Sequence, residues 1–271
     1  MDTKGCDGYI KQFINHYGIA FLTEDQLRFG FIQKLELTHD NAEIEKPYIL
    51  KNNGNENNNG ILSNEKNKDL LKDDSRARLD LYYLKDGIKN YVEFKYHYSY
   101  DGDCPNTKFG KVMNDLHRLS LLANALHDPE NKKFYFVYCF NNEMKTSIEE
   151  WGGKQIIDKE LANLFLYPNK NYSAKNYVQK NKFWNKTKER NNSWGFGEFR
   201  KESFSSFICN ANDDKKNESQ YGWLPKDNNK DYNIDFLTDI EYNNVYWESI
   251  GDLTLVVLEI TKNVTKDKKR R

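Results

Sequence analysis

Two pairs of like charges are predicted to face each other in the segment RARLDLYYLKDGIKNYVEFK, residues 76–95. The Asp-Gly pair in its middle is typical of a two-residue hairpin turn. Such a turn places Asp80 opposite Glu93, about 5 Å apart between their Cβ atoms, and it places Arg78 opposite Lys95. Because like charges directly opposite each other destabilise a sheet, the pattern indicates that another group is bound over these residues.

A divalent cation would remove the repulsion between the two carboxylates. Without it, one of Asp80 and Glu93 would tend to hold a proton. Mg²⁺ takes oxygen ligands, commonly one or two carboxylates together with waters and a substrate phosphate, and the Phe94 carbonyl offers one more oxygen. Lys95 points the same way, where an ammonium steadies an attacking water or the charge that develops on phosphorus, and Arg78 suits a phosphate. The alternative, a solvent-exposed polar face of an ordinary hairpin, stays open.

The alternation of side chains along a strand assigns the two faces of this hairpin. In the first strand it puts Leu79 and Leu81 together on one face and Asp80 on the other. We therefore expect two closely joined strands, at roughly 77–84 and 89–97, with the charged groups gathered on a single face.

A helix is expected upstream, in the stretch FLTEDQLRFGFIQKLEL. Thr23 is a candidate N-cap, and Gln26 three positions later completes a capping box. Leu27, Phe31 and Leu35 recur at i, i+4 and i+8, so they form one apolar stripe that faces the core.

Further segments complete the expected core. NAEIEKPYIL predicts a strand that Pro47 confines to an edge or ends early. GKVMNDLHRLSLLANAL predicts a helix with one apolar stripe, and seven consecutive apolar residues at 134–140 predict a strand buried on both faces, as in a parallel arrangement. The order is helix, three strands, helix, strand. It predicts an α/β fold with a mixed central sheet and helices on both sides.

Asp80 followed by Glu93-Phe94-Lys95 resembles the motif of the PD-(D/E)XK nuclease superfamily. The order of elements over residues 22–140 also resembles the core of that superfamily, the restriction-endonuclease-like fold. The resemblance implies that Asp80 and Glu93 bind Mg²⁺, with Mn²⁺ able to substitute, and that Lys95 assists the nucleophilic water.

Glu24 matches an acidic residue that many members carry in the first helix, and the resemblance implies that it helps to hold the metal. A Glu in the first turn is also favoured simply by the helix dipole, so this alternative stays open. The chain departs from the family pattern in two places. Leu79 stands where the motif often has Pro, and residues 51–75 form an Asn-rich insertion that the family core lacks.

Residues 1–145 are expected to form the nuclease core, interrupted by the insertion at 51–75, which holds eight Asn and only four aliphatic residues. Residues 146–271 are expected to be a C-terminal elaboration that supplies DNA contacts or a dimer surface. Within it, SIEEWGGKQIIDKELANLFLYP predicts a helical region broken at its Gly-Gly pair, and NVYWESIGDLTLVVLEITK predicts a second hairpin that turns at its Gly-Asp pair.

Several basic and aromatic residues are candidates for contact with nucleic acid. Lys111, Asp115 and Arg118 fall at i, i+4 and i+7 on the second helix. Either they form an ion-paired flank beside the apolar stripe, or Lys111 or Arg118 contacts the DNA backbone. Residues 173–201 hold eight Lys or Arg against two Glu. Lys182 and Trp184 within this stretch suit phosphate contact and base stacking, although ordinary core packing of the aromatics is an equal alternative.

Composition limits the classes of function. The 41 basic and 41 acidic residues give no net charge, so a nucleic-acid partner must be held by a local patch. The four cysteines are widely scattered and show no CxxC spacing, which favours reduced thiols over disulfides or a zinc site. The sequence contains no apolar run long enough for a membrane span and begins without an apolar signal region, so a cytoplasmic protein without a membrane partner is expected.

These observations predict a Mg²⁺-dependent endodeoxyribonuclease of restriction or defence type that acts on DNA. Restriction enzymes of this fold commonly dimerise to cut both strands, so the resemblance implies a homodimer as one form of the protein. The alternative is a catalytically inactive protein of the same fold that binds DNA or assembles with a partner.

Overall fold

The computed structural model describes eight parts of the chain, which are residues 11–12, 16, 22–47, 78–98, 105–126, 131–154, 157–174 and 239–262. The Asn-rich insertion at 51–75 lies outside the described residues, as do Lys182, Trp184 and nearly all of 173–201. No described helix is both long enough and apolar enough to cross a membrane.

The described helices and strands follow the order that the sequence predicts as far as residue 141. In chain order they are α2 (Glu24–Lys34), β1 (Ala42–Pro47), β2 (Arg78–Lys85), β3 (Ile88–His97), α3 (Pro105–Ala125), β4 (Lys132–Asn141), α4 (Asn142–Gly153), α5 (Lys159–Leu166), β5 (Asn171–Ser173), β6 (Ile240–Ile250) and β7 (Leu253–Lys262).

The seven strands of the described residues belong to one mixed sheet with the order β1-β2-β3-β4-β7-β6-β5. β4 pairs parallel with β3 and antiparallel with β7, and the remaining pairs are antiparallel. The buried, parallel β4 confirms the prediction made from the apolar run at 134–140. The hairpin of β6 and β7 is also confirmed, and it joins the same sheet through β4.

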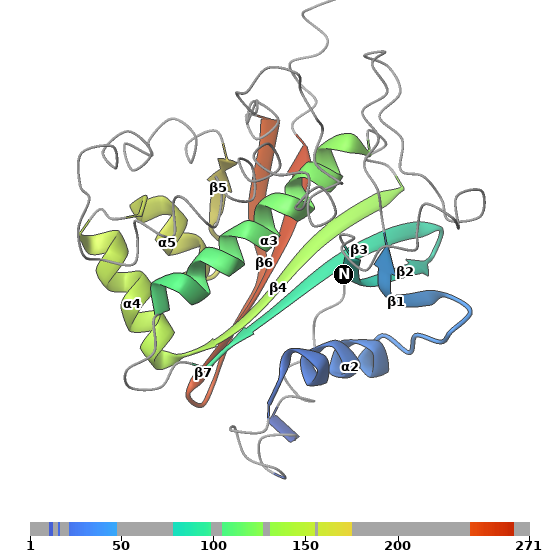
Figure 1. Ribbon diagram of the computed structural model, residues 1–271, viewed down its shortest axis with the longest axis horizontal. Coiled ribbons are helices and arrows are strands. Elements are labelled where there is room, and N and C mark those ends of the chain that lie inside the picture. The colour runs from blue at the N-terminus through green and yellow to red at the C-terminus, as the bar shows by residue number, and fades with distance from the viewer. Residues whose placement is uncertain are drawn as a thin grey trace, which may run out of the picture.

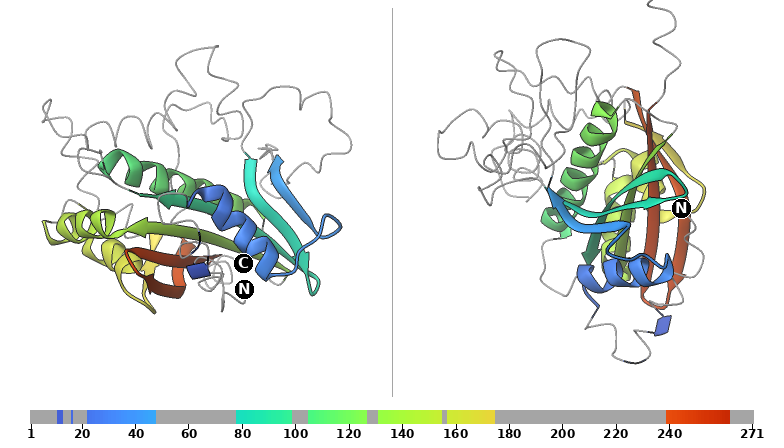
Figure 2. Two further views of the ribbon diagram at one scale, coloured as in Figure 1. Left: turned by 90° about the horizontal axis from the view of Figure 1, so that it is seen from below. Right: turned by 90° about the vertical axis from the view of Figure 1, so that its right-hand side faces the viewer.

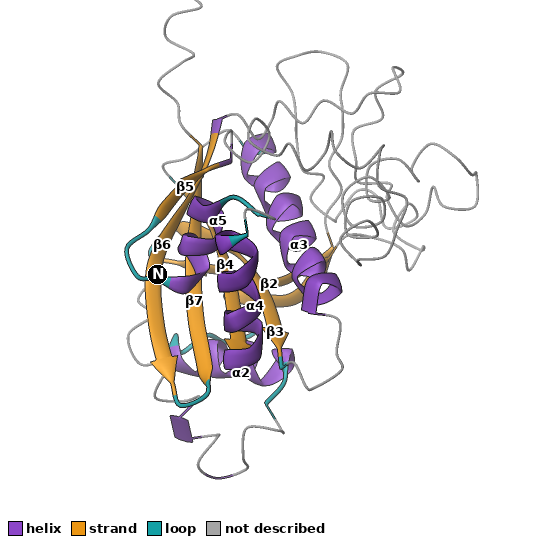
Figure 3. Cartoon of the chain, turned by 90° about the vertical axis from the view of Figure 1, so that its left-hand side faces the viewer, coloured by secondary structure: helices purple, strands orange, loops and turns teal. Residues whose placement is uncertain are grey.

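Helices cover both faces of this sheet, which confirms the predicted α/β class. Figure 1 and Figure 3 show α3, α4 and α5 on one side and α2 on the other. One apolar cluster joins α3, α4 and α5 to their face, and a second joins α2 to the opposite face. β4 lies in the middle of the sheet and contributes alternate side chains to both clusters.

α2 begins where the capping pattern predicts. The Thr23 hydroxyl accepts a hydrogen bond from the Gln26 amide at 3.4 Å and donates one to the Gln26 side chain at 2.6 Å. Leu27, Phe31 and Leu35 are buried in the second cluster, and Phe31 makes an edge-on ring contact with another buried aromatic. This burial fixes the start of α2 against the sheet, beside the middle of β3.

The hairpin of β2 and β3 has the turn that the sequence predicts. Asp86 and Gly87 both have positive φ, 53° and 76°, as a type I′ turn requires. The paired residues run from Lys85 and Ile88 at the turn to Leu81 and Val92, in the predicted register. The predicted pairs of Asp80 with Glu93 and of Arg78 with Lys95 lie beyond this paired stretch.

Close packing of α4 on α5 gives a first testable prediction. A Cβ added to Gly152 would lie 2.7 Å from the Cβ of Ala162, whereas one added to Gly153 meets nothing within 4 Å. Gly152→Ala is therefore expected to destabilise the fold by about 1–3 kcal/mol through overpacking, and Gly153→Ala is the matched control. Urea unfolding of both variants measures the difference, and equal stabilities would contradict this packing.

Candidate functional site

The site is centred on Asp80, which is the next residue of β2 beyond the paired Leu81. There the Asp80 side chain, through Oδ2, accepts a hydrogen bond of 2.7 Å from the backbone amide of Phe94 in β3. A side-chain oxygen thus satisfies an amide that faces β2. The left view of Figure 2 shows that β1 and β2 diverge from β3 with increasing distance from the hairpin turn.

The core packing also changes at Asp80. Leu79 belongs to the cluster under α3, whereas Leu81 belongs to the cluster under α2. The prediction that these two leucines share a face is therefore wrong at Leu79. The regular alternation of β2 breaks between them, because the strand turns out of the plane that it shares with β3.

Glu93 and Lys95 lie on the α3 side of β3, since Phe94 between them packs in the opposite cluster. Glu93 is buried, with 1% of its surface exposed. Lys95 is partly buried, with its side chain 19% exposed. β3 therefore carries a buried carboxylate and a partly buried ammonium on its α3 side, and Asp80 of β2 acts on the charge of Lys95. That Asp80 and Glu93 hold one metal together stays a prediction.

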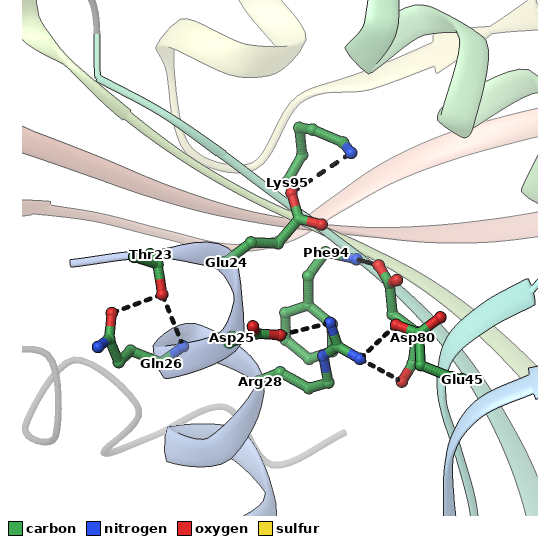
Figure 4. Close-up of polar contacts among 9 residues, drawn as sticks. All are labelled: Thr23, Glu24, Asp25, Gln26, Arg28, Glu45, Asp80, Phe94 and Lys95. Carbon is green, nitrogen blue, oxygen red and sulfur yellow. Dashed lines mark hydrogen bonds and ion pairs between the residues drawn. The ribbon is translucent and has the colours of Figure 1, made fainter.

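Lys95 joins the two helical layers. Its Nζ lies 2.8 Å from Oδ2 of Asp115 in α3 and 3.3 Å from Oε2 of Glu24 in α2. Figure 4 shows the Lys95–Glu24 contact and the bond from Phe94 to Asp80 next to it. Glu24 in the first turn of α2 and Asp115 in the middle of α3 therefore both contact the Lys95 ammonium. This contact lies beyond the stretch in which β2 pairs with β3.

The charges of this cluster are coupled. Burial acts to lower the pKa of Lys95, but the carboxylates of Asp115, Glu24 and Asp80 outweigh it and the pKa is raised. Burial raises the pKa of Glu24, and Asp80 and Asp115 add to this rise while Lys95 opposes it. Lys95 therefore stays protonated over the whole neutral range.

The donor set suits a hard divalent cation. Asp115 and Glu24 contact Lys95, and Asp80 acts on its charge. Buried Glu93 lies two residues before Lys95 on the same side of β3. A carboxylate has about four lone-pair sites, so the bond from Phe94 leaves Asp80 with further acceptor capacity. No group of three or more His, Cys, Asp or Glu in the described parts of the chain could hold a metal by itself. Mg²⁺ commonly binds through only one or two carboxylates and completes its shell with water and phosphate.

Protein-family models, curated proteins and solved structures contain no match to this chain. The site is therefore interpreted from its own geometry.

The other predicted site residues fall into three groups. Arg78 lies at the start of β2, and Lys111 and Arg118 lie in α3, but their side chains are not described, so their contacts with DNA stay predictions. Lys182 and Trp184 lie outside the described residues. Glu24 is next to Lys95, and its role as a metal ligand stays a prediction.

The sequence interpretation missed two residues at the site. Asp115 was grouped with a charged flank of its helix, but it lies nearer to the Lys95 ammonium than Glu24 does. The signal was its place four residues from Lys111 and next to the stripe that contains Leu116. Arg28 was missed because it occupies the apolar side of α2, where it is only 6% exposed.

The raised pKa of Glu24 gives a second prediction. A group whose pKa is higher in the folded state stabilises the fold most below its unfolded value, 4.5, and this contribution is lost as the pH rises through the folded value. The stability of the wild type relative to Glu24→Gln is therefore expected to fall as the pH rises from 4 toward neutrality. Urea unfolding of both proteins in chelator measures this difference, and a difference that grows with pH would contradict the shift.

Proposed function

We propose that this protein is a Mg²⁺-dependent nuclease that hydrolyses phosphodiester bonds in DNA. The observation that carries the proposal is the set of charges around Lys95, where Asp115 and Glu24 make contacts and Asp80 acts on the same ammonium. Buried Glu93 lies two residues earlier on the same side of β3. Carboxylates are the ligands that Mg²⁺ takes in proteins.

Each residue has a role in hydrolysis, in which the water oxygen bonds to phosphorus and a bond from phosphorus to a sugar oxygen breaks. Asp80 and Glu93 would hold Mg²⁺, which when bound stabilises the charge that develops on the phosphoryl oxygens. Lys95 orients the attacking water and donates hydrogen bonds to the same charge. Asp115 keeps the ammonium in place and protonated.

The arrangement of elements supports the same proposal. A helix, a three-stranded meander, a second helix and a parallel fourth strand follow one another from α2 to β4, which is the order expected for a restriction-endonuclease-like core. The biological setting that fits such an enzyme is restriction or another defence against foreign DNA, with DNA as partner and a homodimer able to cut both strands. Arg78, Lys111 and Arg118 are the proposed contacts to the DNA backbone.

Plasmid cleavage tests the function directly. The full chain incubated with supercoiled plasmid and Mg²⁺ is expected to convert it to open-circular and linear forms, and a chelator is expected to stop the reaction. Substituting Mn²⁺ should sustain cleavage. An absence of cutting with either metal, on plasmid, genomic or phage DNA, would argue against the proposal.

One observation favours a second function, that of a nuclease-fold protein that binds DNA or a partner without catalysis. Lys95 already has two carboxylate neighbours, Asp115 and Glu24, and a structural ion-pair network has the same form. The two functions differ in metal binding. Calorimetric titration with Mn²⁺ should show a site in the enzyme, whereas DNA binding without any metal site would favour the scaffold.

A further inference from the structure

Glu45, which lies opposite Asp80 on the neighbouring strand β1, has an unusual backbone conformation. β1 and β2 pair Ile44 with Leu81 and Lys46 with Leu79, so Glu45 faces Asp80, yet Glu45 has φ of 53°. Within the described strands it is the only residue other than glycine with positive φ. Such a conformation costs about 1–3 kcal/mol and persists where surrounding contacts enforce it.

Arg28 of α2 provides those contacts. Its Nη1 lies 2.6 Å from Oε1 of Glu45 and donates a longer bond of 3.4 Å to the main-chain carbonyl of Asp80, and its Nη2 lies 2.7 Å from Oδ1 of Asp25. Figure 4 shows the guanidinium between these three groups. The residue is only 6% exposed, and its Nε has no hydrogen-bond partner in the described part of the molecule.

A buried ion pair is weak evidence for stability alone, because taking the charges out of water offsets much of their attraction. The position of the Arg28–Glu45 pair beside Asp80 indicates a role other than stability. On one side of Asp80 lies Glu45 of β1 with its irregular backbone, and on the other side the regular pairing of β2 with β3 ends. Arg28 contacts both the Glu45 carboxylate and the main-chain carbonyl of Asp80.

We propose that Arg28 is a positioning residue of the metal site: by holding Glu45 and the Asp80 main chain, it keeps β2 away from β3 so that the Asp80 carboxylate, and not the β2 backbone, accepts from the Phe94 amide. This inference rests on the proposed function. Without the guanidinium, Glu45 relaxes to ordinary strand geometry, the two strands pair further, and the Phe94 amide bonds to the β2 backbone in place of the carboxylate.

Two variants and one control test the role. Arg28→Met removes the cation, and Glu45→Gly removes the carboxylate that Arg28 holds while glycine tolerates the positive φ without strain. Phe31→Leu is the control, since Phe31 packs on the ring of Phe94 from the same helix and lies outside the polar cluster. All three are measured as full chains by Mn²⁺ calorimetry and by NMR hydrogen exchange of the Phe94 amide.

Both polar variants are expected to weaken Mn²⁺ binding by about 10–100-fold, as loss of an outer-shell partner does, and to change the exchange rate of the Phe94 amide, whereas the control binds Mn²⁺ as the wild type does. If Arg28→Met does not fold, Glu45→Gly decides the question. Wild-type Mn²⁺ affinity in the folded polar variants would overturn the role of Arg28 and leave the proposed function standing. A wild-type protein that binds no Mn²⁺ would overturn both.

Discussion

Lys95→Met is expected to lower the rate of Mg²⁺-dependent DNA cleavage by about 10²–10³-fold, the usual effect of removing one group that stabilises transition-state charge. Methionine keeps most of the length and the apolar stem of lysine, so the packing on β3 is retained while the ammonium between Asp115 and Glu24 is lost. Single-turnover cleavage of a plasmid measures the rate, and circular dichroism checks the fold.

Lys154→Met is the matched control for this variant. Lys154 follows α4, forms a surface ion pair with Glu150, and is 62% exposed. It loses the same charge at a distance from the proposed site and should cleave at the wild-type rate. Equal rates for Lys95→Met and the wild type would remove Lys95 from the chemistry and favour the non-catalytic alternative.

Asp80→Asn and Asp80→Ala are expected to abolish metal binding equally and to differ in stability. Both remove the charge, so Mn²⁺ affinity should fall by more than the roughly 10–100-fold typical of an outer-shell partner. Asn keeps a side-chain oxygen that accepts from the Phe94 amide, whereas Ala leaves this buried N–H unpaired at a cost of about 1–3 kcal/mol.

Calorimetric titration with Mn²⁺ and urea unfolding in chelator separate these two effects. The alanine variant should be the less stable of the pair, while neither variant should bind the metal. An asparagine variant that binds Mn²⁺ as tightly as the wild type would show that the Asp80 charge does not hold a cation.

Local signals in the sequence predicted most of the fold that surrounds the site. The Thr23 cap, the Asp86-Gly87 turn and the apolar run of β4 each depend on neighbours within a few residues. Such signals fix the element boundaries and the register near the turn, because turn chemistry and side-chain periodicity act over short distances.

The details of the site could not be predicted in the same way. Extending the hairpin register assumed that β2 stays flat beside β3, but Leu79 packs on the other face from Leu81. The pairing of Lys95 with Asp115 and the contact of Arg28 with Glu45 join segments that are distant in the chain. No local pattern specifies these contacts, since they depend on how the helices pack on the finished sheet.

The measurement that tests the central claim most directly is anomalous diffraction from crystals of the full chain grown with Mn²⁺. We predict one strong peak within coordination distance of carboxylate oxygens of both Asp80 and Glu93, on the side of β3 that carries Lys95. The absence of a peak there, with the crystals holding Mn²⁺ at other carboxylates, would contradict a metal-dependent nuclease site at this place.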